Sequence, residues 1–305
     1  MKIGIIGAGA MGCIYGTYLC KHNEVLLVDV VQAHVDAINE KGLEFVHLDG
    51  TTEIYKNMKA TTDTKGYSAA DLVILLTKGY QSADALSANA SLIGPKTIVL
   101  TLQNGYGNSD EIVKFVPEEQ IVVGTSGGGA IVAGPGYVLH KGQGPTHLGC
   151  LTEDQTNADI VAKLMEEGGV PHVELTPDVK ELVWSKVFVN VGINGICALL
   201  NDTNQCIANN EFARAASYAL VNEAVEIVNA SGMNFDFEEV FQNVIDIALE
   251  TGGNIASMLA DVTNKRRTEV DQINGAVVSE AKKLGMEAPL NELMTNLIHA
   301  KEQLY

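Results

Sequence analysis

The chain has 305 residues, 46% of them hydrophobic, and a formal net charge of −18. The length favours two domains, and the hydrophobic content is sufficient for a buried core in each. Nucleic-acid phosphates require a basic face, so the acidic charge excludes nucleic acid as an expected partner. No uninterrupted apolar run reaches the roughly 20 residues that span a bilayer, and we expect no membrane segment.

Cysteine and histidine usage indicates a reducing compartment and no metal. The five cysteines are odd in number and form no Cys-x-x-Cys pair, which favours buried thiols over disulfides. The seven histidines show no His-Glu-x-x-His or similar spacing. The N-terminal residues read directly as a strand, without the charged flank or cleavage site of a signal peptide. We therefore expect a cytoplasmic protein without a metal site.

The first thirty residues predict a dinucleotide-binding unit. A strand over residues 2–6, a glycine-rich turn, a helix over residues 13–21 and a strand over residues 24–28 follow in order. In this turn Gly7 allows the tight bend, Gly9 lets a pyrophosphate approach the backbone, and Gly12 lets the helix pack on the sheet. The predicted cofactor-binding residues of the turn are Gly7, Ala8, Gly9, Ala10, Met11 and Gly12.

Asp29 follows the second strand and distinguishes the two nicotinamide dinucleotides. A carboxylate here accepts hydrogen bonds from the ribose 2′-hydroxyl and repels the 2′-phosphate of NADP. No Arg or Lys follows between Val30 and Glu40 to bind that phosphate. We therefore favour NAD over NADP as the cofactor. The alternative is that Asp29 caps the helix expected over residues 31–41.

Residues 1 to about 125 alternate short strands and helices, which is typical of a parallel sheet with crossover helices. Strands over residues 71–77 and 97–101 each end in a polar cluster, the first with Lys78 and Gln81, the second with Asn104. Ligands bind beyond the carboxyl ends of such strands, so both clusters share a rim with the glycine turn. The alternatives are an exposed loop lysine and a simple Asn-Gly turn.

A change of structural class near residue 178 predicts the domain boundary. Before it we expect a two-stranded excursion over residues 43–58 and antiparallel strands over 121–147; after it the chain is nearly all helical. We predict a Rossmann-type α/β domain over residues 1–177 and an all-α substrate and catalytic domain over residues 178–305, with the active-site cleft between them. The expected helices of the second domain cover residues 178–200, 211–231, 237–250, 268–284 and 290–303.

The first of these helices carries Lys186, Asn190 and Asn194 at four-residue spacing, which places them in one slowly drifting stripe. The rest of the helix is apolar nearly all round, as in a buried helix. Polar groups on a buried helix need partners, so we predict that the stripe faces a substrate site. The alternative is a polar stripe that faces solvent.

A second polar cluster lies between residues 254 and 271. The hydroxyl of Ser257 is suited to bind a carboxylate, and Glu269 is an acid of undecided role. Arg266 and Arg267 are more typical of a solvated face with ion pairs.

Together these motifs resemble the ketopantoate reductases and their D-2-hydroxyacid dehydrogenase relatives. The matching segments occur in family order and cover nearly the whole chain: residues 7–12, 78–81, 103–105, 142–149, 184–186, 190, 194–200, 257–259 and 267–275.

The resemblance implies a role for each candidate residue. It implies that Lys186 is the catalytic proton donor to the substrate carbonyl and that Glu269 works with it. The substrate-binding residues that it implies are Asn104, Asn190, Asn194, Asn204 and Ser257. Lys78 and Gln81 match positions beside the cofactor, as does Asn104.

Two departures from the ketopantoate reductases shift the expected function. Those enzymes typically prefer NADP and carry a basic residue where this chain has Asp29, and their frequent Ser-Met-Leu-Gln-Asp is Ser-Met-Leu-Ala-Asp at residues 257–261. We therefore expect an NAD-dependent, D-mandelate-type dehydrogenase acting on C3-branched 2-keto acids and D-2-hydroxy acids, and a homodimer is common in such folds. The alternatives are an NADPH-dependent 2-dehydropantoate 2-reductase of pantothenate biosynthesis and a non-catalytic NAD-binding sensor.

Overall fold

The computed structural model describes every residue from Met1 to Tyr305 and divides the chain into two compact units. The first contains Met1–Gln103 and Asn108–Leu182, and the second contains Val183–Tyr305 together with the short segment Asn104–Gly107. The first unit is an α/β domain and the second is helical, so the predicted fold class is confirmed.

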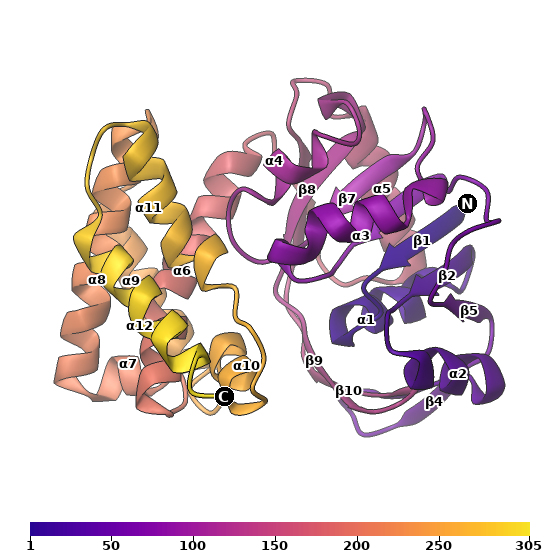
Figure 1. Cartoon of the computed structure of the whole chain (residues 1–305), viewed down its shortest axis with the longest axis horizontal. Coiled ribbons are helices and arrows are strands. Elements are labelled where there is room, and N and C mark those ends of the chain that lie inside the picture. Colours follow the sequence, from indigo (N-terminus) through magenta and orange to yellow (C-terminus); the bar gives the residue numbers. More distant parts are fainter. The chain divides into compact units, whose positions relative to one another are not determined.

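An eight-stranded sheet forms the centre of the first unit (Figure 1). Its strand order is β12-β11-β8-β7-β6-β1-β2-β5. All neighbouring strands are parallel except the antiparallel pair of β8 and β11. The strands are β1 (Lys2–Ile6), β2 (Glu24–Val28), β5 (Met58–Thr61), β6 (Leu72–Leu75), β7 (Ile98–Thr101), β8 (Ile121–Ser126), β11 (Thr146–Cys150) and β12 (Val173–Leu175).

Helices cover both faces of this sheet, which explains its continuous apolar strands. All four residues of β6 are buried. Ile3 and Ile5 of β1 join the core formed with α1 and α5, whereas Gly4 between them faces Leu92 on the opposite side. The helices of this unit are α1 (Ala10–Leu19), α2 (Gln32–Lys41), η1 (Gly79–Gln81), α3 (Ser82–Ala88), η2 (Ala90–Leu92), α4 (Asn108–Ile112), η3 (Glu118–Gln120) and α5 (Thr156–Gly168).

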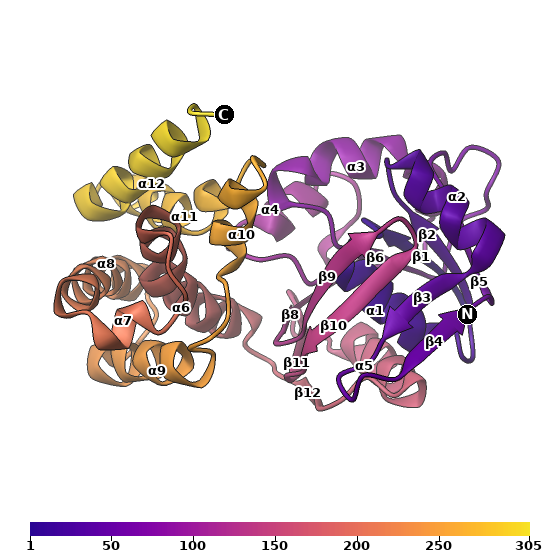
Figure 2. The ribbon, with the colours of Figure 1, turned by 90° about the horizontal axis from the view of Figure 1, so that it is seen from below.

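A second, four-stranded sheet lies beside the large one in the order β4-β3-β10-β9 (Figure 2). Its strands are β3 (Leu43–Val46), β4 (Thr52–Tyr55), β9 (Gly129–Gly134) and β10 (Tyr137–Gly142). The antiparallel pair of β3 and β4 confirms the predicted excursion over residues 43–58. The strands expected over residues 121–147 divide between the two sheets, because β8 and β11 join the large one.

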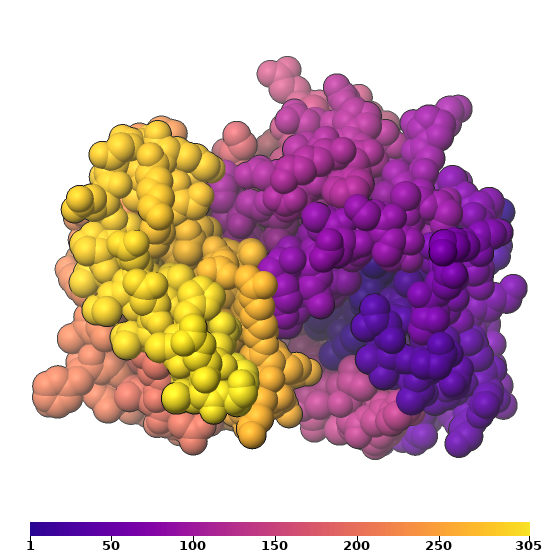
Figure 3. Space-filling model, viewed as in Figure 1, coloured from indigo at the N-terminus to yellow at the C-terminus, as the bar shows by residue number.

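The second unit consists of helices, and α11 and α12 form part of its outer surface (Figure 3). The side chain of Asn210 caps α8 and that of Asp236 caps α9. The helix predicted over residues 268–284 is wrong at its start, because the helical turn η4 and a break precede α11. The helices are α6 (Val179–Leu200), α7 (Cys206–Asn209), α8 (Glu211–Ala230), α9 (Phe237–Glu250), α10 (Ser257–Thr263), η4 (Val270–Gln272), α11 (Asn274–Lys283) and α12 (Pro289–Glu302).

Helix α6 is the core of the second unit. Gly192 of α6 lies against Val221 of α8 and Val244 of α9, and Gly195 lies against Met294 of α12. By length and mean hydropathy, 1.5 over its most apolar window, α6 would suffice to cross a membrane, but 67% of that window is buried inside the protein. The prediction that no segment reaches this length and hydropathy is therefore wrong for α6, whose apolar surface forms the helical core.

We predict that Phe188→Ala lowers the free energy of unfolding by about 3–5 kcal/mol, because a large buried ring leaves a cavity. Phe188 is fully buried and packs edge-to-face on Phe235, with ring centroids 5.0 Å apart. The matched control is Phe212→Ala, since Phe212 is 78% exposed and should cost about 0.5 kcal/mol or less. Urea unfolding followed by circular dichroism measures both, and equal losses would contradict the assignment of α6 as the core.

Candidate active site

The turn between β1 and α1 leaves open space in front of one glycine only. A Cβ added at Gly7, where φ is +99°, would lie 2.7 Å from the backbone of Leu76, and one added at Gly12 would lie 2.1 Å from the carbonyl oxygen of Gly7. A Cβ added at Gly9 would meet no atom within 4 Å. Gly7 and Gly12 are therefore required by the fold, whereas the space at Gly9 is available to a ligand.

This cradle fits the pyrophosphate of a dinucleotide. Gly9 is the N-cap of α1, and no side chain caps the helix there. Unpaired N–H groups and the helix dipole favour an anion at such an end. Ala8 is buried beneath the turn, while Ala10 and Met11 open α1 and are partly exposed.

Asp29 lies directly after β2 and is partly exposed. Its Oδ1 accepts a hydrogen bond of 3.0 Å from the backbone N–H of Val31, and its Oδ2 makes no hydrogen bond within the chain. The N-cap of α2 is Val31, so Asp29 shapes the turn before α2 without capping the helix. One carboxylate oxygen is thus left for a ribose hydroxyl.

The loop after β6 holds Lys78 and Gln81 at the carboxyl end of the parallel strands. Lys78 is partly exposed, Gln81 is exposed, and the N–H of Gln81 donates to the carbonyl of Lys78 across η1 at 2.8 Å. Gln103, at the end of β7, donates from Nε2 to the carbonyl of Thr77 at 2.8 Å and is hydrogen-bonded to Ser82. The sequence alone assigns Gln103 no role, although Gln103 lies next to Asn104. In the structure its hydrogen bonds to Thr77 and Ser82 hold the loop that carries Lys78.

Asn104 belongs to the segment that clusters with the helical unit. Next to it Gly105, with φ of +91°, packs so closely on Gln272 that an added Cβ would lie 2.3 Å from the Gln272 carbonyl oxygen. The N–H of Tyr106 donates to the same oxygen at 2.9 Å, and its ring stacks on Trp184 at 4.4 Å. Asn104 is therefore held near η4, the turn that follows Glu269.

Lys186 of α6 and Glu269, in the stretch before η4, interact electrostatically within the helical unit. Most of the surface of Lys186 is buried, and Glu269 is only 5% exposed. Burial lowers the pKa of the Lys186 ammonium to about 8, and the negative charge of Glu269 opposes this shift. A lysine in this state exchanges its proton near neutral pH, which an ordinary surface lysine does not.

The polar stripe on α6 continues from Lys186 towards α10. Asn190 is partly exposed and Asn194 is 6% exposed, so the alternative of a solvent-facing stripe fails at Asn194. The amide of Asn194 donates to Oγ of Ser257 at 3.5 Å, and Ser257 is itself exposed at the start of α10. The structure therefore brings the stripe together with Ser257.

Asn204 and the two arginines Arg266 and Arg267 make hydrogen bonds or ion pairs within the helical unit. Asn204 is buried, and its amide donates to Oγ1 of Thr251 at 2.9 Å. Arg266 and Arg267 are exposed and pair with Asp261 at 3.4 Å and Asp271 at 3.0 Å, as the sequence predicted. All five cysteines are buried free thiols, which also confirms the prediction.

A dinucleotide cradle on an α/β domain and a lysine–glutamate pair on a helical domain define a nicotinamide-dependent oxidoreductase. Two sequence models match the chain: "Ketopantoate reductase PanE/ApbA" over residues 3–153 and its C-terminal counterpart over residues 178–302. The chain belongs to the ketopantoate reductase family, whose members are NAD(P)-dependent oxidoreductases acting on CH–OH groups. The family resemblance and the prediction of an enzyme are thereby confirmed.

Individual relatives carry two different names. The 2-dehydropantoate 2-reductase of Pyrococcus horikoshii is 34% identical over 305 residues, covering 100% of this chain and 98% of that protein. The enzyme of the same name from Streptococcus pyogenes serotype M3 is also 34% identical, covering 99% and 98%. A structure of D-mandelate dehydrogenase with NADH and anilino(oxo)acetate is similar with a TM-score of 0.94 and 34% identity, covering 99% of this chain and 98% of that one.

We predict that Gly9→Ala and Gly12→Ala separate cofactor binding from folding. Gly9→Ala should keep the wild-type melting temperature and weaken NADH binding by about tenfold or more, because an overpacked contact costs on the order of 1–3 kcal/mol. Gly12→Ala should lower the melting temperature, because its Cβ meets the Gly7 carbonyl oxygen. Fluorescence titration with NADH and thermal melts measure the two effects; unchanged NADH affinity in Gly9→Ala would contradict the cradle.

Proposed function

We propose that the protein reduces the C2 ketone of a C3-branched 2-keto acid to the D-2-hydroxy acid with NADH. The observation that carries this proposal is the Lys186–Glu269 pair, in which burial holds the pKa of the lysine at about 8. When bound, the nicotinamide supplies the hydride. Negative charge then develops on the substrate oxygen, and a positioned ammonium both stabilises that charge and delivers the proton.

The helical unit supplies the chemistry and the substrate contacts. Lys186 donates the proton, and the Glu269 carboxylate holds the ammonium in place and favours its charged form. Amide and hydroxyl donors bind the substrate carboxylate and hydroxyl without adding charge to a buried site. We assign this role to Asn104, Asn190, Asn194, Asn204 and Ser257, and the hydrogen bond of Asn204 to Thr251 positions its amide.

The α/β unit supplies the cofactor site. The turn from Gly7 to Gly12 takes the pyrophosphate, and Oδ2 of Asp29 accepts a hydrogen bond from the adenosine ribose. Lys78 and Gln81, at the same end of the sheet, contact the cofactor. The preference for NAD over NADP is supported by Asp29 and by the similar D-mandelate dehydrogenase structures, which contain NADH.

The two parts of the chain have different roles in this proposal. Residues 1–177 serve the cofactor, and residues 178–305 together with Asn104 serve the substrate. The five buried free thiols support a cytoplasmic location. We also propose a homodimer, on the basis of the family resemblance, and a small 2-keto acid as the partner rather than nucleic acid or a membrane.

A second candidate is an NADPH-dependent 2-dehydropantoate 2-reductase. The observation in its favour is the shared name of the relatives from Pyrococcus horikoshii and Streptococcus pyogenes at 34% identity. Both candidates use the same residues and mechanism, since ketopantoate is itself branched at C3. They differ in cofactor and in substrate side chain. A non-catalytic NAD-binding sensor would need the cradle but not the Lys186–Glu269 pair.

We predict that Lys186→Ala reduces kcat by about a thousandfold, because the proton donor and the charge that stabilises the oxyanion are both lost. NADH affinity should stay at its wild-type value, since the cradle lies in the other unit. The matched control is Lys180→Ala, which removes an exposed lysine of the same helix and should leave kcat unchanged. Retained turnover in Lys186→Ala would contradict the catalytic role of Lys186 and favour the non-catalytic NAD-binding sensor.

The pKa of about 8 for Lys186 sets a pH dependence with opposite signs in the two directions. Reduction needs the protonated lysine, so kcat/KM for the keto acid should be level below pH 8 and fall about tenfold per pH unit above it. Oxidation of the hydroxy acid needs the neutral lysine, so its kcat/KM should rise about tenfold per pH unit below pH 8 and be level above it. Steady-state assays in both directions test this, and a reduction rate that rises above pH 8 is the contradicting result.

We predict that Asp29→Ser raises kcat/KM for NADPH by about tenfold and lowers kcat/KM for NADH. The variant loses the hydrogen bond from the ribose to the carboxylate, which contributes about 1.5–3 kcal/mol to NADH binding. It also loses the negative charge that repels the 2′-phosphate of NADPH. Asp36→Ser is the control, since Asp36 is an exposed acid on α2 whose Oδ1 bonds Gln32. Its cofactor ratio should equal that of the wild type. If Asp29→Ser leaves the ratio unchanged, Asp29 does not select the cofactor.

A further inference from the structure

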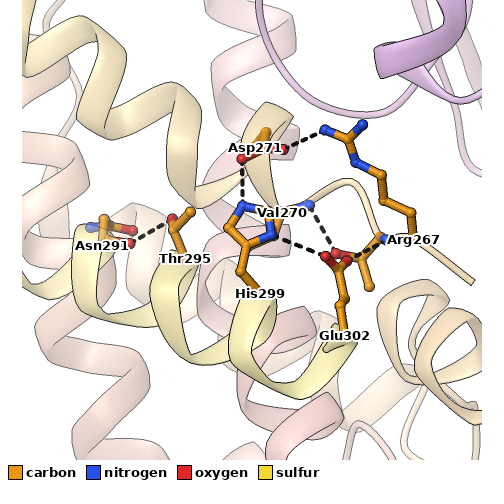
Figure 4. A network of polar contacts seen from close by, with 8 residues as sticks. Arg267, Val270, Asp271, Asn291, Thr295, His299 and Glu302 are labelled. Atoms are coloured by element: carbon orange, nitrogen blue, oxygen red, sulfur yellow. Dashed lines mark hydrogen bonds and ion pairs between the residues drawn. The ribbon is translucent and has the colours of Figure 1, made fainter. Parts of the chain in front are cut away.

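His299, on α12, lies between two carboxylates that come from different parts of the helical unit (Figure 4). Its Nε2 lies 2.8 Å from Oδ1 of Asp271 in η4, and its Nδ1 lies 3.0 Å from Oε2 of Glu302 on its own helix. An ionised carboxylate can only accept a hydrogen bond, so both ring nitrogens must donate, and this requires the imidazolium form. The contact is therefore a double charge-assisted clamp rather than a single histidine hydrogen bond.

The surrounding charges favour this form. Burial lowers the pKa of His299, but the hydrogen bonds and charges of Glu302 and Asp271 outweigh it, and the net effect raises that pKa. Arg267 pairs with the other oxygen of Asp271, Oδ2, at 3.0 Å. On the other helices packed against α12, Glu223 of α8 accepts the N–H groups of Leu290 and Asn291 at the opposite end of α12, and Glu280 of α11 pairs with Lys283.

The contacts of His299 and Glu302 hold the chain on both sides of Glu269. On the N-terminal side, Oε1 of Glu302 accepts a hydrogen bond from the N–H of Thr268 at 2.6 Å. On the C-terminal side, Asp271 is fixed by His299 and Arg267. Glu269 lies between Thr268 and Asp271, in the non-helical stretch before η4. These two flanking residues are both tied to α12.

We propose that His299 is a positioning residue that, through Glu302 and Asp271, fixes Glu269 against Lys186. The inference rests on the proposed catalytic role of that pair. Without the imidazolium, Asp271 and Glu302 would repel each other and the segment 267–271 would move away from α12. Glu269 is the charge that acts on Lys186, so its displacement would lower the pKa of Lys186. His299 is a raised-pKa group, and its stabilising effect is present below the usual histidine pKa and lost as the pH rises through the folded-state value.

The test measures the titration of Lys186 without turnover. Trace acetylation of the intact protein as a function of pH, read by peptide mass spectrometry, gives the titration midpoint of Lys186. The wild type should titrate near pH 8. His299→Gln should move the midpoint down by about half a pH unit or more, because the support from Glu269 is weakened. The matched control is His47→Gln, which breaks a histidine–carboxylate pair with Glu53 in the α/β unit and should leave the midpoint unchanged.

A second variant covers the case in which His299→Gln does not fold. Glu302→Gln keeps an oxygen for the Thr268 N–H but removes the charge opposite Nδ1, and it should shift the Lys186 midpoint in the same direction. In both variants kcat should fall about tenfold or more while NADH affinity is unchanged, because Glu269 is displaced but the cradle is not. An unchanged midpoint in the variant that folds, shown by circular dichroism, overturns the inference.

Failure of the positioning inference is distinguishable from failure of the proposed function. A shifted midpoint in a protein that reduces no keto acid would support the positioning role of His299 and reject the reductase. An active wild type, an inactive Lys186→Ala and an unshifted midpoint in folded His299→Gln would leave the reductase standing and reject the role of His299.

Discussion

The helical unit depends on one costly arrangement, a lysine desolvated on an apolar core helix beside a buried glutamate. Taking the Lys186 ammonium out of water disfavours its charge, and the carboxylate of Glu269 restores part of that loss. The balance leaves the lysine able to give up and regain a proton near neutral pH. An apolar core would pack more easily without either group, so we attribute the presence of Lys186 on α6 and of Glu269 before η4 to the proposed chemistry rather than to stability.

Three segments converge on this pair. Helix α6 supplies Lys186 and the two asparagines, the break before η4 supplies Glu269, and the segment Asn104–Gly107 is fastened to Gln272 of η4 and to Trp184 of α6. Helix α12 contributes no substrate contact in this account, yet it holds the η4 segment through His299 and Glu302. The candidate site is thus built from helices plus one short irregular stretch, and that stretch carries Glu269.

Features encoded locally could be predicted from the sequence, and features set by distant partners could not. The unit from β1 to β2, the glycine turn and α6 follow from short-range patterns, so their positions were correct. The prediction of a single helix over residues 268–284 is wrong because Thr268 and Asp271 are hydrogen-bonded to Glu302 and His299, some thirty residues later in the chain. The placement of Asn104 with the helical unit and of β8 in the large sheet likewise depends on long-range contacts. The position of Asp29 directly after β2 follows from the sequence, while its hydrogen bond from the Val31 N–H is visible only in the structure.

The central claim is that the Lys186–Glu269 pair serves the reduction of a C3-branched 2-keto acid by NADH. The most direct measurement is kcat/KM for ketopantoate, 2-ketoisovalerate and benzoylformate, each with NADH and with NADPH. We predict that the highest value belongs to NADH with 2-ketoisovalerate or benzoylformate, and that the product is the D-2-hydroxy acid. The highest value for NADPH with ketopantoate would contradict it and identify the protein's activity as that of its relatives from Pyrococcus horikoshii and Streptococcus pyogenes.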